Sequence, residues 1–559
     1  MSGSRHVITS AKLIAVCTLV SRVTGMLRDM LLLHLFGLTW VADAFNYGFQ
    51  FPNLFRRLFG EGALAAVFVP RFTNTLESEG KESAWRLLAR TRALLVTVLI
   101  GLVVALELVL LCVWLATPRD DAARAQDTFL LLALTAVMLP FVLSVCVTAL
   151  LGSILNCLGS FVPAALAPIV LNVGMIAAIW AAPASASREQ AALIVALSVP
   201  LAGLFQLGLL APALRAHGVR LGWELNTRDE HVRRMIALMG PVAIGQGALL
   251  LSTFLDVQVC ALLTQVSPDA PRGSFLGLTF DYPLKAGALS AVSVAQRLYQ
   301  FPLGVLVISL ATAALPAFSR LAVRAEWPAW AEEVRRTFRV ATLEGVLAGA
   351  MMLVLAEPIV RLLFEYGNFM PADTSRAAYV LQWYGAGMWA FCVQHIVQRG
   401  FYSVGDVRTP VYISCTLLPI NFFLSLFLLW IDGIREAAFA ISSSLTSALS
   451  VVIGLACLRR HARAPLLDAA TIRTLVRIVF AAIVAAAAVH ALRAGCRFLP
   501  PELTTSLAGR AIETLGGLAV GTATYAGAAW LFGVREVDLL LRTGRGRRDP
   551  AGPADNPAP

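Results

Sequence analysis

Long apolar stretches alternate with short polar or Pro/Gly-containing breaks along most of this chain. Each stretch is about 20 residues or longer, which is the length an α-helix needs to cross the hydrocarbon core of a bilayer. We count about fourteen stretches of this kind, and they predict an all-α polytopic membrane protein with about 14 transmembrane helices. Their approximate centres are Val20, Phe55, Leu99, Val137, Leu171, Leu201, Leu250, Val305, Leu347, Met388, Leu424, Leu445, Val484 and Val520.

The basic residues predict the orientation of these spans. An even number of spans places both termini on one side of the membrane. Lys and Arg gather at the termini and in alternate loops, and cytoplasmic loops carry such an excess. We therefore expect both termini to be cytoplasmic. The basic loops cover residues 71–92, 215–234, 320–339, 399–408 and 459–477.

Composition excludes several classes of protein. Hydrophobic residues make up 58% of the chain and charged residues 14%, against about 25% charged residues in soluble domains. The net charge of +11 is spread over loops, which argues against nucleic acid as a partner. Nine cysteines and seven histidines lie scattered without CxxC or HExxH spacing, so we expect no metal and no cofactor. The first apolar run is not followed by a cleavage site, so we expect no removed signal peptide.

A weak internal repeat predicts two related halves. FPNL at Phe51 is echoed by FPLG at Phe301, and GSILNCLGSFVP at Gly152 is echoed by GFYSVGDVRTP at Gly400. The paired motifs occur in the same order, which favours two pseudo-symmetric lobes of six helices. The predicted domains are an N-terminal lobe at 1–222, a C-terminal lobe at 223–463, an extra helix pair at 464–535 and a basic, Pro/Gly-rich disordered tail at 536–559.

Charged side chains stand inside the first two predicted spans. Arg22, Arg28, Arg56 and Arg57 occur there, and each would cost about 2.5–3.5 kcal/mol at the centre of a bilayer. We therefore expect them to face a wet cavity. Arg22 and Asp29 lie on one helical face, whereas Arg28 lies about 120° away.

The second of these spans carries its own polar face. Asn53, Arg56 and Arg57 follow Pro52 at helical spacing. Several guanidiniums together suit phosphate or diphosphate oxygens, which arginine binds bidentately. Three acids, Asp29, Asp43 and Glu61, would orient the arginines when the site is empty. In the alternative interpretation, these charges cap helix ends at the water interface or pair as static ion pairs.

The second half supplies a matching polar strip and an isolated acid. Ser290, Arg297 and Gln300 share a helical face just before Pro302, and they predict the opposite wall of the cavity. Asp256 is another acid within a predicted span. It is either an acid near the outer end of its helix, hydrogen-bonded to Ser252 or Thr253, or a site for a coupling cation.

Ordered motifs give the chain a family resemblance. They are SRVTGMLRD, DAF, FPNLFRRLFGEGA and FVP, then LLGSILNCLGSFVPAALAPIVLN, AQRLYQFPLGVL, LFEYGNF and GFYSVGDVRTP. In this order they resemble the MurJ (MviN) family of bacterial lipid II flippases, within the multidrug/oligosaccharidyl-lipid/polysaccharide exporter superfamily. The resemblance extends to about Leu458. The family usually has an acid at the position of Gln300, so a carboxylate partner for Arg297 is not expected there.

The resemblance implies a function and a location. Two lobes would enclose a central cationic cavity in the bacterial cytoplasmic (inner) membrane, and the extra helix pair would line a groove for the lipid tail. Alternating access would carry lipid II, an undecaprenyl-diphosphate-linked disaccharide pentapeptide, from the inner to the outer leaflet, without any enzymatic step. Membrane lipids and the cell-wall synthesis machinery are the other implied partners. Coupling would be to the membrane potential or to Na⁺ or H⁺.

Other functions remain open at this level. The same fold could export another lipid-linked oligosaccharide or drugs, although drug exporters that bind cations call for acids rather than arginines. A membrane enzyme acting on a lipid diphosphate would need clustered His/Asp or paired carboxylates, which the sequence does not show. A scaffold of the cell-wall machinery would leave the arginines unexplained. The segment 267–285, an outer connection rich in Phe and Tyr, is expected to pack on the membrane surface or on a partner.

Overall fold

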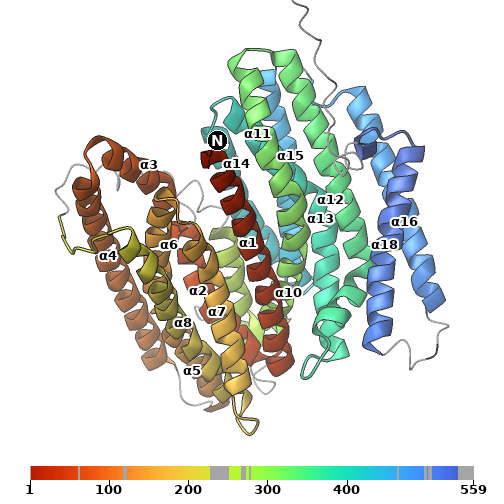
Figure 1. Cartoon of the computed structure of the whole chain (residues 1–559). Helices are drawn as coiled ribbons and strands as arrows, with labels where there is room; N and C mark the ends of the chain where they lie inside the picture. Colours follow the sequence, from red (N-terminus) through yellow and green to blue (C-terminus); the bar gives the residue numbers. More distant parts are fainter. Residues whose placement is uncertain are drawn as a thin grey trace, which may run out of the picture. The chain divides into compact units, whose positions relative to one another are not determined.

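The computed structural model describes nearly the whole chain, and the described part is mainly helical (Figure 1). The described residues are 2–60, 63–117, 122–226, 251–265, 272–275, 278–462, 465–496, 500 and 506–538. Of the predicted C-terminal tail at 536–559, residues 539–559 lie outside them.

The first half of the chain contains eight labelled helices and one π-helical turn. They are α1 (Ser2–Phe36), α2 (Trp40–Phe55), η1 (Arg56–Gly60), α3 (Ala63–Ser78), α4 (Lys81–Ala116), α5 (Ala122–Met138), α6 (Phe141–Cys157), α7 (Val162–Ala181) and α8 (Arg188–Ala216).

The second half begins with a helical stretch at Leu251–Leu262 and four short strands. The strands are β1 (Thr264–Gln265), β2 (Arg272–Phe275), β3 (Leu278–Asp281) and β4 (Leu284–Lys285). Further helices are α10 (Ala288–Pro302), η2 (Leu303–Val307), α11 (Ile308–Val323), α12 (Trp327–Phe364), α13 (Pro371–Ser403), α14 (Arg408–Leu428), α15 (Ala437–Ala462), α16 (Ala469–Cys496) and α18 (Leu507–Leu531).

The same local break occurs in both halves of the chain. In the first half, Pro52 lies near the end of α2, and the π turn η1 and then α3 follow. In the second half, Pro302 ends α10, and the π turn η2 and then α11 follow. Proline removes a backbone donor and disturbs the preceding turn, and π turns absorb such irregularities. The similar sequences FPNL and FPLG therefore form similar local structures, in which a proline is followed by a π turn.

Long apolar helices give this chain the character of a multi-pass membrane protein. Nine helical segments among the described residues are long and apolar enough to cross a membrane. The helices α1 and α13 are not among these nine, because charged and polar residues lower the mean hydropathy of a segment, and α2, with 16 residues, is shorter than a full span. The count of fourteen remains a prediction.

Contacts divide the chain into two compact units. Unit 1 comprises Met1–Ala295, Leu363–Val380 and Ser414–Ser442, and unit 2 comprises Gln296–Leu362, Leu381–Ile413 and Ser443–Pro559. These boundaries differ from the predicted lobes, which stay a prediction.

Unit 1 has a large apolar core built by α1 to α8. Phe36, Phe45, Phe72 and Phe141 are almost fully buried in it, together with Leu88 of α4. In the connection that precedes α10, β2 pairs antiparallel with β3 and β1 pairs parallel with β4. Phe280 of β3 lies edge-on against Trp430, with ring centroids 6.0 Å apart.

Unit 2 has two apolar cores, and α12 contributes to both. In the first, Trp330 donates a hydrogen bond from Nε1 to the Ser403 hydroxyl (3.0 Å). The second lies between α12, α16 and α18, where α16 and α18 run side by side (Figure 1). The Tyr525 hydroxyl donates to the Leu343 carbonyl (2.8 Å) within it. The extra helix pair is therefore packed directly on α12.

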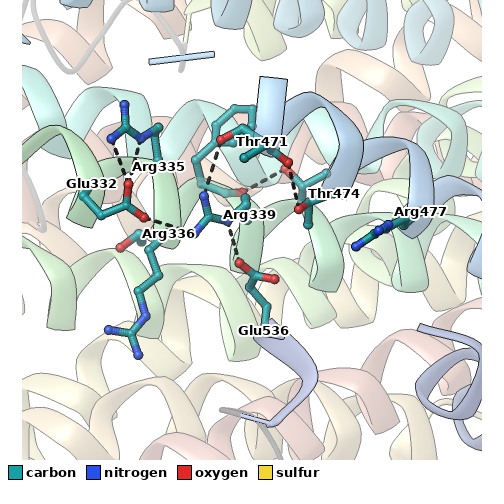
Figure 2. Close-up of polar contacts among 12 residues, drawn as sticks. Glu332, Arg335, Arg336, Arg339, Thr471, Thr474, Arg477 and Glu536 are labelled. Atoms are coloured by element: carbon teal, nitrogen blue, oxygen red, sulfur yellow. Dashed lines mark hydrogen bonds and ion pairs between the residues drawn. The ribbon is translucent and has the colours of Figure 1, made fainter. Parts of the chain in front are cut away.

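Polar contacts secure one end of this helix pair (Figure 2). Arg339 of α12 donates from Nε to Glu536, which follows α18, and from Nη1 to Thr471 of α16 (3.4 Å). Glu332 accepts hydrogen bonds from Arg339 (3.3 Å) and from Arg335. One half-buried guanidinium thus joins α12, α16 and the segment after α18.

At the opposite end of the helix pair, another arginine, Arg493, joins α16 to α18 and α12. Arg493 of α16 donates to Glu513 of α18 (3.1 Å), to the Val354 carbonyl of α12 (2.7 Å) and to Glu357 (3.4 Å). Because both ends and the middle are joined to α12, we expect the pair to move with α12 as one body.

Candidate functional site

The charged part of α1 is an internal ion pair in unit 1. Arg28 donates from Nε and Nη2 to Oδ1 of Asp29 (3.0 and 2.8 Å). Both residues are only 6% exposed, whereas Arg22 is exposed. A buried ion pair is tolerated when further hydrogen bonds satisfy its remaining groups. Of the two arginines predicted on α1, one is therefore enclosed by protein and one is accessible.

Asn172 of α7 supplies that further hydrogen bonding. Its Oδ1 accepts from Nη1 of Arg28 (3.0 Å), and its Nδ2 donates to the Ser21 carbonyl and the Thr24 hydroxyl (both 3.1 Å). The Phe49 ring of α2 lies 5.5 Å from the guanidinium carbon. Arg28 is thus held by groups from α1, α2 and α7. Asn172 was not among the predicted site residues, although an amide within an apolar span was a usable signal.

Asp43 binds the first turn of α10. Its Oδ2 accepts from the Gly287 backbone N–H, and its Oδ1 accepts from the backbone N–H and the hydroxyl of Ser290, each at 2.7 Å. Asn46 donates to the same Ser290 hydroxyl (3.1 Å). A carboxylate at a helix N-terminus satisfies unpaired N–H groups and complements the helix dipole. Two predicted site residues, Asp43 and Ser290, therefore meet, and Asp43 caps a helix there.

Contacts on the neighbouring segments extend this junction. Arg376 of α13 donates to Glu436 (2.8 Å) and to the Ala286 carbonyl (2.9 Å), just before α10. Asn368 donates from its backbone N–H to the His34 carbonyl (3.0 Å) and from Nδ2 to the Leu35 carbonyl (2.8 Å), at the end of α1. We call the contacts of Asp43, Arg376 and Asn368 the helix-end clasp. All of its members belong to unit 1.

The second arginine pair lies at the π turn η1. Arg56 is half-buried and donates from Nη2 to Oδ1 of Asn53 (3.5 Å), whereas Arg57 is exposed. Both are placed by the break that follows Pro52. Glu61, predicted to orient them, lies outside the described residues.

Arg297 is positioned by contacts between α10 and α13. It is half-buried. On either side of it, Gln296 donates to the Tyr384 hydroxyl (3.2 Å) and Tyr299 stacks on Tyr384 with centroids 4.5 Å apart. Gln300 is exposed. Arg297 belongs to unit 2 and the other four arginines to unit 1, so the convergence of all five stays a prediction.

Asp256 is enclosed in unit 1 near a second bridging asparagine. Its side chain is hydrogen-bonded by Asn421 of α14, which also donates to the Ser252 hydroxyl (3.0 Å). Asp256 is 7% exposed, and within the described part of the chain its Oδ1 has no hydrogen-bond partner. The predicted partners were Ser252 or Thr253. Asn421 bonds both Asp256 and Ser252. In the same way, Asn172 bonds both Arg28 and a hydroxyl group, that of Thr24.

Comparisons with known proteins agree with this architecture. The family model "Lipid II flippase MurJ" matches residues 32–500. A relative from Rhizobium meliloti, named "Probable lipid II flippase MurJ", is 31% identical over 536 residues and covers 94% of each chain.

Solved structures show the same fold. A "Lipid II flippase MurJ, inward closed conformation" superposes with a TM-score of 0.71 at 17% identity, covering 94% of this chain and 99% of that one. An inward-facing multidrug resistance MATE family transporter of the MOP superfamily gives a TM-score of 0.60 at 11% identity, covering 81% and 98%. With its multi-pass helical fold and a family match that spans most of its length, this chain belongs to the MurJ family of lipid II flippases.

Proposed function

We propose that this protein moves lipid II from the inner to the outer leaflet of the bacterial inner membrane by alternating access, with both termini in the cytoplasm. The family match over residues 32–500 carries this proposal. It also makes the protein a transporter rather than an enzyme. Functional partners in the cell-wall synthesis machinery fit the same role.

The arginines supply the chemistry that a lipid diphosphate needs. Arg57 is exposed and Arg56 is half-buried beside Asn53, and guanidiniums of this kind bind phosphate oxygens bidentately. Arg28 is paired with Asp29. A diphosphate that competes with the Asp29 carboxylate would draw Arg28 into the substrate site. The substrate-binding set is then the predicted one: Arg22, Arg28, Asp29, Asp43, Asn53, Arg56, Arg57, Glu61, Ser290 and Arg297.

The helix-end clasp supports alternating access. On the predicted topology it lies on the outer side, where α1, α2 and α10 begin or end. Asp43, Asn368 and Arg376 all bind backbone groups at helix ends. Such bonds hold only while the helix ends stay in register. Opening to the outside would break them together, which makes the clasp a two-state element of the kind that transport requires.

Asp256 is proposed as the site of a coupling cation. A buried carboxylate without a full set of partners favours a bound Na⁺ or H⁺, and Asn421 and Ser252 offer neighbouring oxygens. The membrane potential can drive export by itself, because two negative charges leaving an inside-negative cell gain about 4.6 kcal/mol per 100 mV. The cation would therefore act by stabilising one conformation over the other.

A reconstituted assay tests the proposed function. Lipid II is incorporated with the protein into vesicles, and the fraction of headgroups accessible to an external reagent is followed over time. We expect accessibility to equilibrate with the native protein but not with Arg28→Ala, while Arg473→Ala, a change at an exposed arginine of α16, serves as the matched control. Equal rates with and without protein would overturn the proposal. If other lipid-linked oligosaccharides slow the movement of lipid II, the protein is an exporter of broader specificity.

A further inference from the structure

Residues 218–226, which follow α8, are fastened to the side of α4 by charged groups. Arg90 donates from Nε and Nη2 to one oxygen of Glu224 (2.9 and 2.7 Å). Arg92 donates from Nη2 to the carbonyls of Leu221 (3.1 Å) and Gly222 (2.6 Å). An ion pair and two bonds to the backbone thus hold a segment that has no regular secondary structure of its own.

Two further contacts bring the segment close to the helix. The Arg92 guanidinium lies 5.9 Å from the centroid of the Trp223 ring, within the range of a cation–π interaction. At Gly222, an added Cβ would lie 3.4 Å from the Ala89 side chain, so the backbone runs in contact with α4. The segment therefore has a fixed position along this helix.

Three apolar side chains of this segment are exposed. Leu221, Trp223 and Leu225 are 46%, 58% and 52% exposed. They alternate along the chain with Gly222, whose backbone contacts α4, and Glu224, which pairs with Arg90. Three large apolar residues exposed within five positions are more than scattered surface hydrophobics and mark an interaction surface.

The position on α4 shows what this surface faces. α4 has 36 residues, which corresponds to about 54 Å, so it extends well beyond a hydrocarbon core of about 30 Å. Its exposed large apolar residues run from Val98 to Leu115, about 26 Å at 1.5 Å per residue. Arg92 lies about 9 Å before Val98 on the same axis. The segment is therefore level with the headgroup layer at the N-terminal end of α4.

The charge around the segment matches the same environment. Arg86 of α4, Arg215 of α8 and Arg220 are all exposed. Guanidiniums at this level bind headgroup phosphates, especially those of anionic lipids, and tryptophan prefers the same layer. In this layer the arginines would lie beside water and headgroups, and the apolar side chains would lie beside acyl chains.

We propose that residues 218–226 form an interfacial foot, in which Leu221, Trp223 and Leu225 insert at the boundary between headgroups and acyl chains, and the neighbouring arginines bind anionic headgroups. The foot fixes the depth of α4 and α8 in the bilayer. It also holds the chain at the membrane surface where the connection to the second half begins. This role is independent of the substrate that the protein carries.

Spin labels on the full-length protein test the proposal. The nine native cysteines are replaced, and Leu225→Cys and Asn226→Cys are labelled separately and reconstituted in vesicles of phosphatidylcholine with phosphatidylglycerol. At residue 225 we expect the ratio of accessibility to oxygen over a water-soluble nickel chelate to be several-fold higher than at residue 226. A ratio at 225 equal to that at 226 would overturn the proposal.

Further measurements test the arginines and the apolar side chains separately. They also distinguish lipid from a partner protein as the group that covers this surface. Removing phosphatidylglycerol should move the label at 225 toward water, and no change would overturn the role of the arginines. Replacing both Leu221 and Trp223 with serine should also lower the ratio at 225, whereas the exposed Arg188→Gln on α8 should not. If the label at 225 is shielded in native membranes but open to the nickel chelate in pure lipid vesicles, the occupant is a protein and the lipid assignment fails.

Discussion

The Asp43 carboxylate of α2 and Ser290 of α10 are joined by two hydrogen bonds of 2.7 Å, one from the backbone N–H and one from the hydroxyl. The residues are 247 positions apart, and the carboxylate completes the N-terminus of a helix in the other half of the chain. Substrate binding and helix capping are therefore alternative uses of Asp43. In the conformation described here, the carboxylate caps α10.

Removing this cap should favour the conformation that is open to the outside. Asp43→Ala leaves the N–H groups of Gly287 and Ser290 without their acceptor, and each buried unsatisfied group costs about 1–3 kcal/mol. Outside labelling of a cysteine at Ala291 should become faster, because α10 separates more readily from α2. Ser290→Ala removes only the hydroxyl bond and should have a smaller effect. Labelling that is equally slow in all three proteins would show that the clasp does not hold the closed state.

The contacts of Arg28 predict graded effects on transport. Arg28→Ala, Arg57→Ala and Arg297→Ala should each abolish complementation of a strain depleted of its flippase, with membrane insertion intact, because removing a charge does not hinder insertion. Asn172→Ala should reduce transport less, since Asp29 still holds Arg28. Asn172→Asp, which keeps an acceptor for Arg28, should retain more activity than Asn172→Ala. Full complementation by all three arginine variants would exclude an anion-binding role.

Asp256→Ala should separate coupling from binding. We expect slower turnover and weaker dependence on the coupling cation in vesicles, with lipid II affinity in detergent unchanged, because Asp256 contacts Asn421 rather than the arginines. Asn421→Ala should have the same effect in a milder form. A fall in lipid II affinity as large as that of Arg57→Ala would place Asp256 in the substrate site.

The start of α16 should be sensitive to acid. Hydrogen bonds from Thr471, assisted by Arg335 and Arg339, lower the pKa of Asp468 below its ordinary value. A lowered pKa in the folded state means that the stabilisation is present above the unfolded-state pKa of about 3.9 and is lost as pH falls through the folded-state value. Asp468→Ala should cost about 0.5–2 kcal/mol, as for other N-caps.

The measurement for Asp468 is the thermal unfolding midpoint in detergent at neutral pH and near pH 3. The native protein should lose more stability on acidification than Asp468→Ala. Glu326→Ala, at an exposed acid in the turn before α12, is the control and should behave like the native protein. Identical losses in all three would mean that the cap contributes nothing measurable.

Labelling of single cysteines tests the orientation. Cysteines at Glu77, near the end of α3, and at Arg324, in the turn after α11, both exposed, should be shielded from an impermeant reagent added outside. A cysteine at Ser185, in the connection between α7 and α8, should react. The reverse pattern would overturn both the orientation and the even number of spans.

Much of this protein could be predicted from its sequence. Helical spans, the polar breaks between them and the repeated Pro52 and Pro302 turns depend on residues close together in the chain, because helix periodicity and proline geometry are local. The motifs that identify the family are also local runs. The cost of charges in lipid predicts a wet cavity for the arginines of the first spans, and that cavity stays a prediction.

Which groups those charges bind was decided by the tertiary structure. Asp29 and Arg28 were expected on different faces of α1. The long Arg28 side chain nevertheless bonds Asp29, and Asn172 of α7 bonds the same guanidinium. Asp43 was expected beside arginines and instead caps α10. A buried polar group takes whichever partner long-range packing brings within about 3 Å, and helical spacing within one segment carries no information about a helix end that lies more than two hundred residues away.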